Sequence, residues 1–269
     1  MPGNDERKIT KSLGLAADSI IFDLEDAVPP LEKSGARETL KRIINQAQKS
    51  RKELCVRINS ANSPFWEEDL LALKEFDPIE TIVIPKADAE FLTRVRKECG
   101  SKNLIPLIET TRSFLRLEDI ARCEGVCALG FGAGDFANSV SGTVSGYTMN
   151  VHVKTQIAIV ARSYGLDPID NVYFELSNIE GFRSEARLAR ELGFAGKQVI
   201  HPTQISAANE IFSPSPQDLE NARKIIEEYE SAESRRVGAI RLDEKLVDAV
   251  HYRQAKEMLD RKKVIDEMT

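Results

Sequence analysis

The sequence has few cysteines and histidines and no long apolar run, and each shortage argues against a class of protein. Four cysteines and three histidines stand among 269 residues. The only close cysteines, Cys123 and Cys127, lack the paired C-x-x-C spacing of zinc knuckles. No run approaches the roughly 18–20 apolar residues of a membrane helix, and segment 1–10 has no apolar core of a secretory signal. We therefore expect a cytoplasmic protein with reduced thiols that binds no membrane.

The charge balance shows no basic excess. The net charge is −6, from 37 Lys and Arg against 43 Asp and Glu, which argues against a nucleic-acid partner. Local basic clusters could still hold a phosphorylated ligand. The length and ordinary composition suit one α/β barrel or two smaller domains.

Short apolar runs rich in Ile and Val alternate with amphipathic stretches. Their nearly continuous apolar character is typical of parallel strands buried on both faces. The predicted strands span 19–25, 54–59, 81–86, 104–110, 126–132, 169–175 and 196–202. The predicted helices between them span 32–50, 67–75, 90–98, 114–123, 150–164 and 180–192. This alternation over residues 1–212 predicts a catalytic (β/α)8 TIM barrel.

An eight-stranded barrel needs one strand more than these runs supply. The turn at Pro2-Gly3-Asn4 leads into an expected helix near 5–14, so the first strand is either missing or reduced to Met1.

The pattern changes after Phe212. Segment 213–218 contains residues typical of the end of one helix and of the N-cap of the next. A charged helix near 219–235, a short β-hairpin or flap over 237–249 and a last helix near 250–261 are expected. We predict that residues 213–269 dock on a neighbouring subunit.

Charged and polar residues recur at the predicted strand ends, where a barrel builds its active site. They are Asp23, Glu25, Asp26, Arg57, Asn59, Lys86, Glu109, Asp135, Glu175 and His201. Converging carboxylates repel each other, and a hard divalent cation relieves that repulsion. Oxygen ligands select Mg²⁺ or Mn²⁺ over zinc. Structural ion pairs, for example Asp23 with Arg57, are the alternative.

The glycine-rich segment 130–136 is not a dinucleotide fingerprint, because Asp135 stands where a glycine is needed. Backbone N–H groups at Gly132, Ala133 and Gly134 could still bind a carboxylate at the start of a helix. A purely structural tight turn is the alternative.

Several motifs resemble the citrate lyase β-subunit-like family, the citryl-, malyl- and citramalyl-CoA lyase group of the HpcH/HpaI aldolase superfamily. The match runs in order over essentially the whole chain. The motifs are PGNDERKI (2–9), FDLEDAVPP (22–30), CVRINS (55–60), EEDLLAL (67–73), PK (85–86), NLIPLIET (103–110), GAGDF (132–136), GKQVIHPTQI (196–205) and FSPSP (212–216).

The resemblance implies a Mg²⁺-dependent carbon–carbon lyase or synthase. Its substrate would be a 3-hydroxyacyl-CoA thioester, converted to acetyl-CoA and a 2-oxo acid. The family's metal ligands fall on Glu109 and Asp135, and its substrate-binding arginine falls on Arg57. Its flap aspartate, an acid/base given to the neighbouring subunit, falls on Asp248. Members are commonly trimers or hexamers, so a homotrimer or homohexamer is expected.

The remaining substrate contacts are predicted at Glu25, Asp26, the 132–134 backbone and His201. His201 either lines the thioester pocket or caps the next helix.

This chain departs from the family at three places. Gly134 replaces a common Glu, Lys154 stands at a common Arg, and 175–178 reads E-L-S-N for D-F-R-D. Two other functions stay open: a metal aldolase acting on free hydroxy-acids without CoA, and a non-catalytic citrate lyase-like accessory protein.

Overall fold

The computed structural model describes residues 1–46, 52–234, 238–242 and 245–268. It contains two compact units, Met1–Ala208 and Asn209–Thr269, whose boundary falls inside helix α11 (Ile205–Phe212). No helix in these ranges is both long and apolar enough to cross a bilayer.

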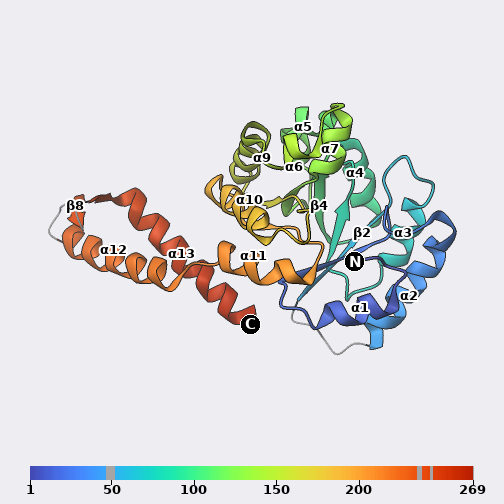
Figure 1. Ribbon diagram of the computed structural model, residues 1–269, viewed down its shortest axis with the longest axis horizontal. Helices are drawn as coiled ribbons and strands as arrows, with labels where there is room; N and C mark the ends of the chain where they lie inside the picture. Colours follow the sequence, from blue (N-terminus) through green and yellow to red (C-terminus); the bar gives the residue numbers. More distant parts are fainter. Residues whose placement is uncertain (47–51, 235–237, 243–244, 269) are drawn as a thin grey trace. The chain divides into compact units, whose positions relative to one another are not determined.

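The first unit is built on a curled parallel sheet of seven strands, which pair in chain order (Figure 1). Each strand pairs with the next through a helical crossover, as the alternation of patterns predicts. The strands are β1 (Ser19–Asp23), β2 (Glu53–Arg57), β3 (Thr81–Ile84), β4 (Asn103–Ile108), β5 (Ala128–Phe131), β6 (Asp167–Asp170) and β7 (Gly196–Lys197). A parallel α/β sheet is thus established, while the pairing among the described strands does not show closure into a complete barrel.

Helices follow the strands, and most lie where the amphipathic patterns predict them. They are α1 (Glu6–Leu13), α2 (Lys33–Gln46), α3 (Trp66–Leu73), α4 (Ala89–Glu98), α5 (Thr111–Leu115), α6 (Leu117–Ala121), α7 (Ala133–Ser139), α8 (Val144–Thr148), α9 (Val151–Ser163) and α10 (Ile179–Glu191). The helix predicted over 114–123 is broken at Arg116, whose φ is −123°. The end of the helix predicted over 32–50 lies outside the described residues.

Strands β3 and β5 are buried along their whole length, because both faces of the sheet are covered there. Cys55, Val83 and Leu107 pack together in the core. Burial raises the pKa of the Cys55 thiol, in agreement with its predicted packing role.

Residues 1–3 pair with β1. Asp23 N–H donates to the Met1 carbonyl (2.6 Å), and Gly3 N–H donates to the Asp23 carbonyl (2.8 Å). Pro2 and Asp23 form a parallel bridge. The predicted first strand is therefore present as a short pairing segment ahead of the turn into α1.

Strands β6 and β7 are shorter than the predicted 169–175 and 196–202. The side chain of Asn171 donates to the Val172 carbonyl (2.8 Å) and to Glu185 Oε1 (2.9 Å), which turns the chain out of the sheet. Glu175 and His201 consequently stand in loops, several residues beyond their strands.

Four buried charges lie beside these strand ends. Asp170 contacts Lys154 Nζ (2.8 Å) and Lys197 Nζ (2.6 Å), and Lys197 also contacts Glu185 (2.6 Å). All four side chains are at most 2% exposed. Lys154, where the family commonly has arginine, thus belongs to a buried network of two cations and two anions.

Replacing Asp170 by asparagine is expected to lower the free energy of unfolding by about 3–5 kcal/mol, because two buried ammonium groups lose their shared carboxylate. Asp167→Asn, on the same strand but in an exposed ion pair with Arg162, should cost at most about 1 kcal/mol. Urea unfolding measures both. Equal midpoints for the two variants would show that the buried network contributes no such stability.

The second unit contains α12 (Pro216–Ser234), an antiparallel hairpin of β8 (Ala239–Leu242) and β9 (Lys245–Asp248), and α13 (Ala249–Met268). The rings of Tyr229 and Tyr252 stack with centroids 4.9 Å apart and join the two helices. The predicted hairpin is confirmed, although positions 235–237 and 243–244 of the predicted tail lie outside the described residues. Both helices are longer than predicted.

Candidate functional site

The carboxyl ends of β1 to β4 bring four charged residues together. Asp23 and Arg57 are register partners at the ends of β1 and β2. Lys86 follows β3, and Glu109 follows β4. Ion pairs and hydrogen bonds join this rim to Glu25, which lies beyond the end of β1.

Arg57 is held by a two-point contact with Asp23. Its Nε donates to Asp23 Oδ1 (2.8 Å), and its Nη2 donates to Oδ2 (2.6 Å). Its Nη1 lies 3.2 Å from Glu25 Oε2. Burial works to raise the pKa of Asp23, but the Arg57 hydrogen bonds outweigh it and the net shift is downward. The ion pair offered as a structural alternative therefore exists, and it fixes the guanidinium plane with Nη1 toward Glu25.

Glu25 is buried and held by two lysines. Lys86 Nζ donates to Glu25 Oε1 (3.0 Å), while Lys33 Nζ donates to the carbonyls of Leu24 (2.7 Å) and Glu25 (2.9 Å). Burial raises the pKa of the Glu25 carboxyl despite the nearby cations. Of the two residues predicted after β1, Glu25 is thus built into the site, whereas Asp26 is exposed, 3.9 Å from Lys86 Nζ.

Glu109 is only 3% exposed, and its Oε1 accepts the Lys86 backbone N–H at 2.6 Å. Burial, and then the charges of Glu25 and Asp135, raise the pKa of Glu109 to about 8. Asp135, in the first turn of α7, has Oδ2 3.8 Å from Lys86 Nζ. The two predicted metal ligands therefore lie within electrostatic reach of each other and share Lys86 as a neighbour.

The approach of β5 to Glu109 requires glycine at position 132. A Cβ added there would lie 2.5 Å from Glu109 Oε2 and 2.7 Å from Glu109 Cβ. Gly132 has φ −117°, which any residue can adopt, so glycine is required here because it has no side chain and not because the backbone is left-handed. Gly134 differs, because a Cβ there would meet only the Phe174 ring at 3.5 Å, an ordinary contact.

The Glu109 and Asp135 pair fits a hard divalent cation. A carboxylate buried beside other carboxylates, with its pKa raised, is stabilised in its ionised form by a cation. Among the described residues no three His, Cys, Asp or Glu side chains form a closed metal cage. Mg²⁺ commonly takes only one or two carboxylates and fills its other positions with water or substrate. The oxygen-only donors thus suit Mg²⁺ or Mn²⁺.

The start of α7 adds donors beside Asp135. Gly132 N–H donates to the Ile108 carbonyl (3.1 Å) and is used by the sheet. The N–H groups of Ala133 and Gly134 stand in the first turn, where an α-helix supplies no acceptor. Of the three N–H groups predicted to bind the substrate carboxylate, those of Ala133 and Gly134 therefore remain available.

Two predicted residues are not gathered into this cluster. His201 is exposed, caps η2 (Pro202–Gln204) and has Nδ1 2.8 Å from Thr203 Oγ1, which corresponds to the capping alternative. Asp248 belongs to the second unit, at the junction of β9 and α13. Its substrate-related role stays a prediction, as does that of His201.

Lys33 and Lys86 are site residues that the sequence reasoning did not assign. The sequence indicates Lys86 as a charged residue at a strand end. Lys33 falls in a predicted amphipathic helix, where a lysine gives no sign of a binding role. Buried Asn59 also supports the loop after β1, because its side chain donates to the Leu24 carbonyl (3.0 Å) and to Asp69 (2.7 Å). Strand-end position was a signal for Lys86 and Asn59, and both residues also lie in motifs that carry the family resemblance, at 85–86 and 55–60.

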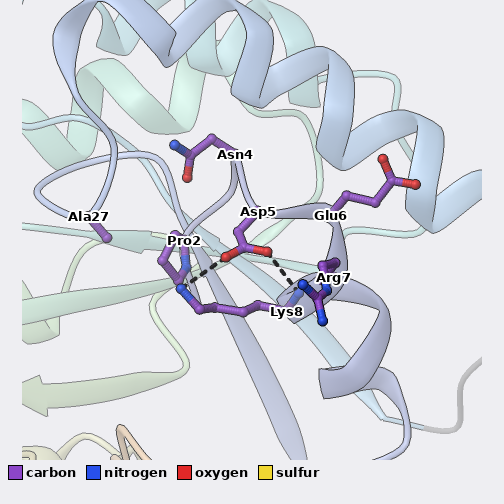
Figure 2. Close-up of a pocket in the computed structure, with 7 residues that line it drawn as sticks. All are labelled: Pro2, Asn4, Asp5, Glu6, Arg7, Lys8 and Ala27. Atoms are coloured by element: carbon purple, nitrogen blue, oxygen red, sulfur yellow. Dashed lines mark hydrogen bonds and ion pairs between the residues drawn. The ribbon is translucent and has the colours of Figure 1, made fainter.

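A surface pocket of about 430 Å³ lies at the start of the chain, lined by Pro2, segment 4–8 and, from the loop after β1, Ala27 (Figure 2). Asp5 caps α1 by accepting the Lys8 N–H (3.0 Å), and it forms an ion pair with Lys8 Nζ (2.9 Å). Ala27 N–H donates to Asp23 Oδ2 (3.1 Å). The pocket therefore borders the same loop that carries Glu25.

The metal-free protein is expected to lose stability as pH rises from about 5 to about 8. The folded pKa of Glu109, about 8, exceeds the value of about 4.3 in an unfolded chain. Between these two pKa values the folded state binds a proton that the unfolded chain has already released. The stability that this proton contributes falls as pH rises and is lost above the folded pKa. Burial raises the pKa of Glu25 in the same direction. Urea midpoints in EDTA measure the slope.

Glu109→Gln should reduce that slope by up to about 1.4 kcal/mol per pH unit. If the variant instead loses stability as steeply as the unmodified protein, Glu109 is not the group that carries the raised pKa.

Comparison with known proteins gives relatives over nearly the whole chain. The (3S)-malyl-CoA thioesterase of Cereibacter sphaeroides is 34% identical over 267 residues, covering 98% of this chain and 93% of that protein. The mitochondrial citramalyl-CoA lyase of Homo sapiens is 31% identical over 279 residues, covering 95% and 82%.

A solved structure extends the likeness to three dimensions. Protein CitE from Mycobacterium tuberculosis, in complex with magnesium, acetoacetate and coenzyme A, matches with a TM-score of 0.80 at 26% identity, over 97% of this chain and 95% of that one. The model of the HpcH/HpaI aldolase/citrate lyase family matches residues 1–202. These findings confirm the resemblance seen in the motifs, and the chain belongs to the HpcH/HpaI aldolase/citrate lyase family.

Proposed function

We propose that this protein is a Mg²⁺-dependent carbon–carbon lyase acting on a 3-hydroxyacyl-CoA thioester, with acetyl-CoA and a 2-oxo acid as products. The observation that carries the proposal is the meeting of two carboxylates around Lys86: the buried Glu109 accepts the Lys86 N–H, and Asp135 Oδ2 lies 3.8 Å from Lys86 Nζ. Relatives named for malyl-CoA and citramalyl-CoA supply the substrate class. The frame is the (β/α)8 barrel predicted from the sequence, with residues 1–3 in the place of its first strand.

Glu109 and Asp135 would hold the cation, with Glu109 oriented by the Lys86 N–H. When bound, Mg²⁺ supplies a Lewis acid for the oxygens of the 2-oxo acid. The N–H groups of Ala133 and Gly134 would bind the substrate carboxylate. Glu109 is only 3% exposed, and burial strengthens the electrostatic contacts that its carboxylate makes.

Arg57 would stabilise the enolate oxygen of the acetyl-CoA half. Asp23 fixes the guanidinium plane through Nε and Nη2, and the side chain is 22% exposed. Nη1, which lies 3.2 Å from Glu25 Oε2, is therefore fixed in position, and the second of its two N–H groups would point at the enolate oxygen without reorientation during the reaction. The CoA phosphates would bind Arg7 and Lys8, two cationic residues that line the pocket beside the loop after β1 (Figure 2).

Asp248 of a neighbouring subunit would act as acid and base at the acetyl methyl group. Its Oδ1 accepts the Val250 N–H (2.9 Å) and lies 2.8 Å from His251 Nδ1, and the hydrogen bond with His251 lowers the pKa of Asp248. The proton would thus pass to Oδ2, the other oxygen of the carboxylate. This assignment requires a homo-oligomer.

Asp248→Ala tests that role. Turnover is expected to fall by about 100-fold or more, the usual contribution of general acid–base catalysis, while Mg²⁺ affinity stays unchanged because Asp248 is not a metal ligand. Asp260→Ala is the control, because Asp260 is an exposed aspartate in helix α13, which follows Asp248, and it is paired with Lys263. Normal turnover in Asp248→Ala removes the residue from the mechanism.

Thioester hydrolysis is the second candidate, favoured by the 34% identity to a malyl-CoA thioesterase. The discriminating assay supplies malyl-CoA, citramalyl-CoA and citryl-CoA, each with Mg²⁺ or with EDTA, and quantifies 2-oxo acid, acetyl-CoA and free CoA thiol. Cleavage gives 2-oxo acid with acetyl-CoA, whereas hydrolysis gives CoA thiol with the intact hydroxy-acid. Turnover of free hydroxy-acids alone, or of nothing, would contradict the proposal.

A further inference from the structure

Lys86 has an unusual backbone conformation. Its φ is +47°, and within the described residues Ser141 is the other non-glycine position with positive φ. A residue with a long side chain avoids this region for steric reasons. Such conformations persist where the surrounding structure requires them, often at functional sites.

The conformation directs both ends of Lys86 into the carboxylate cluster. The backbone N–H donates to Glu109 Oε1 at 2.6 Å, while Nζ donates to Glu25 Oε1 at 3.0 Å. The same Nζ lies 3.8 Å from Asp135 Oδ2. One residue thus contacts both predicted metal ligands, the first through its backbone and the second through its charge.

The two contacts have opposite consequences for a cation. A neutral N–H that orients Glu109 leaves the second oxygen, Oε2, available. An ammonium group beside Asp135 instead repels an incoming divalent ion. Arg57 does not share this position, because its charge is paired with Asp23 and Glu25.

Lys86 has the freedom to withdraw from Asp135. Its side chain is 33% exposed, and the donor hydrogen bond to Glu25 is shorter than the 3.8 Å ion-pair distance to Asp135. Movement of the ammonium away from Asp135 would leave the Glu25 contact and the backbone contact in place.

We propose that Lys86 is a positioning residue that serves as the resident counter-ion of the metal site: its N–H fixes Glu109, and its ammonium group competes with the divalent cation for Asp135. The inference rests on the metal site of the proposed function. It predicts that removing the ammonium group strengthens metal binding, whereas a merely structural lysine would leave binding unchanged or weaken it.

Calorimetric titration of MgCl₂ into the EDTA-stripped, dialysed full-length protein tests this without substrate. Lys86→Met is expected to lower the Mg²⁺ Kd about fivefold, since a partly exposed ion pair at this distance is worth up to about 1 kcal/mol. Lys86→Gly provides a second neutral variant that accepts the positive φ, so loss of folding in one does not leave the idea untested. Lys86→Arg keeps the charge and should stay within about twofold of the unmodified protein.

Lys74→Met is the matched control, because Lys74 is an exposed lysine 3.8 Å from Glu98, and its Kd should also stay within about twofold. An unchanged or higher Kd in both neutral Lys86 variants, with normal binding by the unmodified protein, overturns the role of Lys86 alone. Absence of Mg²⁺ and Mn²⁺ binding by the unmodified protein overturns the proposed function and this inference together.

Discussion

Replacing Glu109 by glutamine is expected to lower kcat/KM at least about 1,000-fold, because a metal Lewis acid contributes several kcal/mol to the transition state. Glutamine keeps the side-chain shape, and its carbonyl oxygen can still accept the Lys86 N–H. It loses the negative charge that binds the cation. Burial raises the pKa of Glu109 to about 8, so the neutral variant should fold at least as well as the metal-free protein.

Steady-state assays with the cleaved thioester, together with Mg²⁺ titration, measure both parts of this prediction. Glu175→Gln is the control, since Glu175 is an exposed carboxylate that accepts a hydrogen bond from the Asn178 side chain (3.1 Å) and contacts neither proposed ligand in the described hydrogen bonds and ion pairs. A Glu109→Gln protein with nearly normal turnover and Mg²⁺ dependence would show that another group carries the charge.

Gly132→Ala is expected to weaken Mg²⁺ binding by about 10- to 100-fold, the range found when the support of a metal ligand is disturbed. No proposed ligand is removed. The new methyl group would lie 2.5 Å from Glu109 Oε2 and 2.7 Å from its Cβ, so the carboxylate must move. The backbone of Gly132, with φ −117°, accepts alanine, which makes the effect steric.

Gly134→Ala is the matched control two residues away in α7. Its methyl group would meet Phe174 at 3.5 Å, and alanine favours helix over glycine by about 1 kcal/mol. Binding within about threefold of normal is expected, because a van der Waals contact without overlap displaces no ligand. Equal losses in both variants would mean that this segment tolerates no side chain, and the steric argument about Glu109 would fail.

The sheet could be predicted because its strands are unusually uniform. Runs such as Thr81–Ile84 are buried at every position and nearly continuous in apolar character, a pattern typical of parallel strands covered on both faces. Strand ends were less predictable where apolar residues continue into a loop. Val172, Tyr173 and Phe174 extend the pattern of β6, but Asn171 turns the chain through hydrogen bonds to Val172 and Glu185. Glu185 lies 14 residues further along the chain, so the local sequence around β6 does not reveal this turn.

The start of α7 was expected from the glycine-rich segment, but its extent and the whole of α8 were not predicted. The segments of α7 and α8 contain glycine, serine and threonine, residues that indicate turns. Tertiary packing overrides that preference, with Phe136 buried against Phe131 and Tyr147.

The site was predictable as a set of strand-end charges, but of its internal pairs only Asp23 with Arg57 was predicted. Strand order places Arg57 beside Asp23, and the sequence reasoning named that pair as an alternative. The local sequence does not indicate that Lys86 has a positive φ, because lysine has no preference for that region. The conformation is stabilised by hydrogen bonds to Glu109 and Glu25, which are distant in sequence. The contribution of Asp248 depends on a second subunit and stays a prediction.

The most direct test of the account is anomalous diffraction from crystals soaked in MnCl₂. We predict one anomalous peak bonded to a carboxylate oxygen of Glu109 and one of Asp135, at about 2.1–2.2 Å. A peak that neither side chain contacts, or a cation held elsewhere while Glu109 keeps its metal-free contacts, would contradict the central claim.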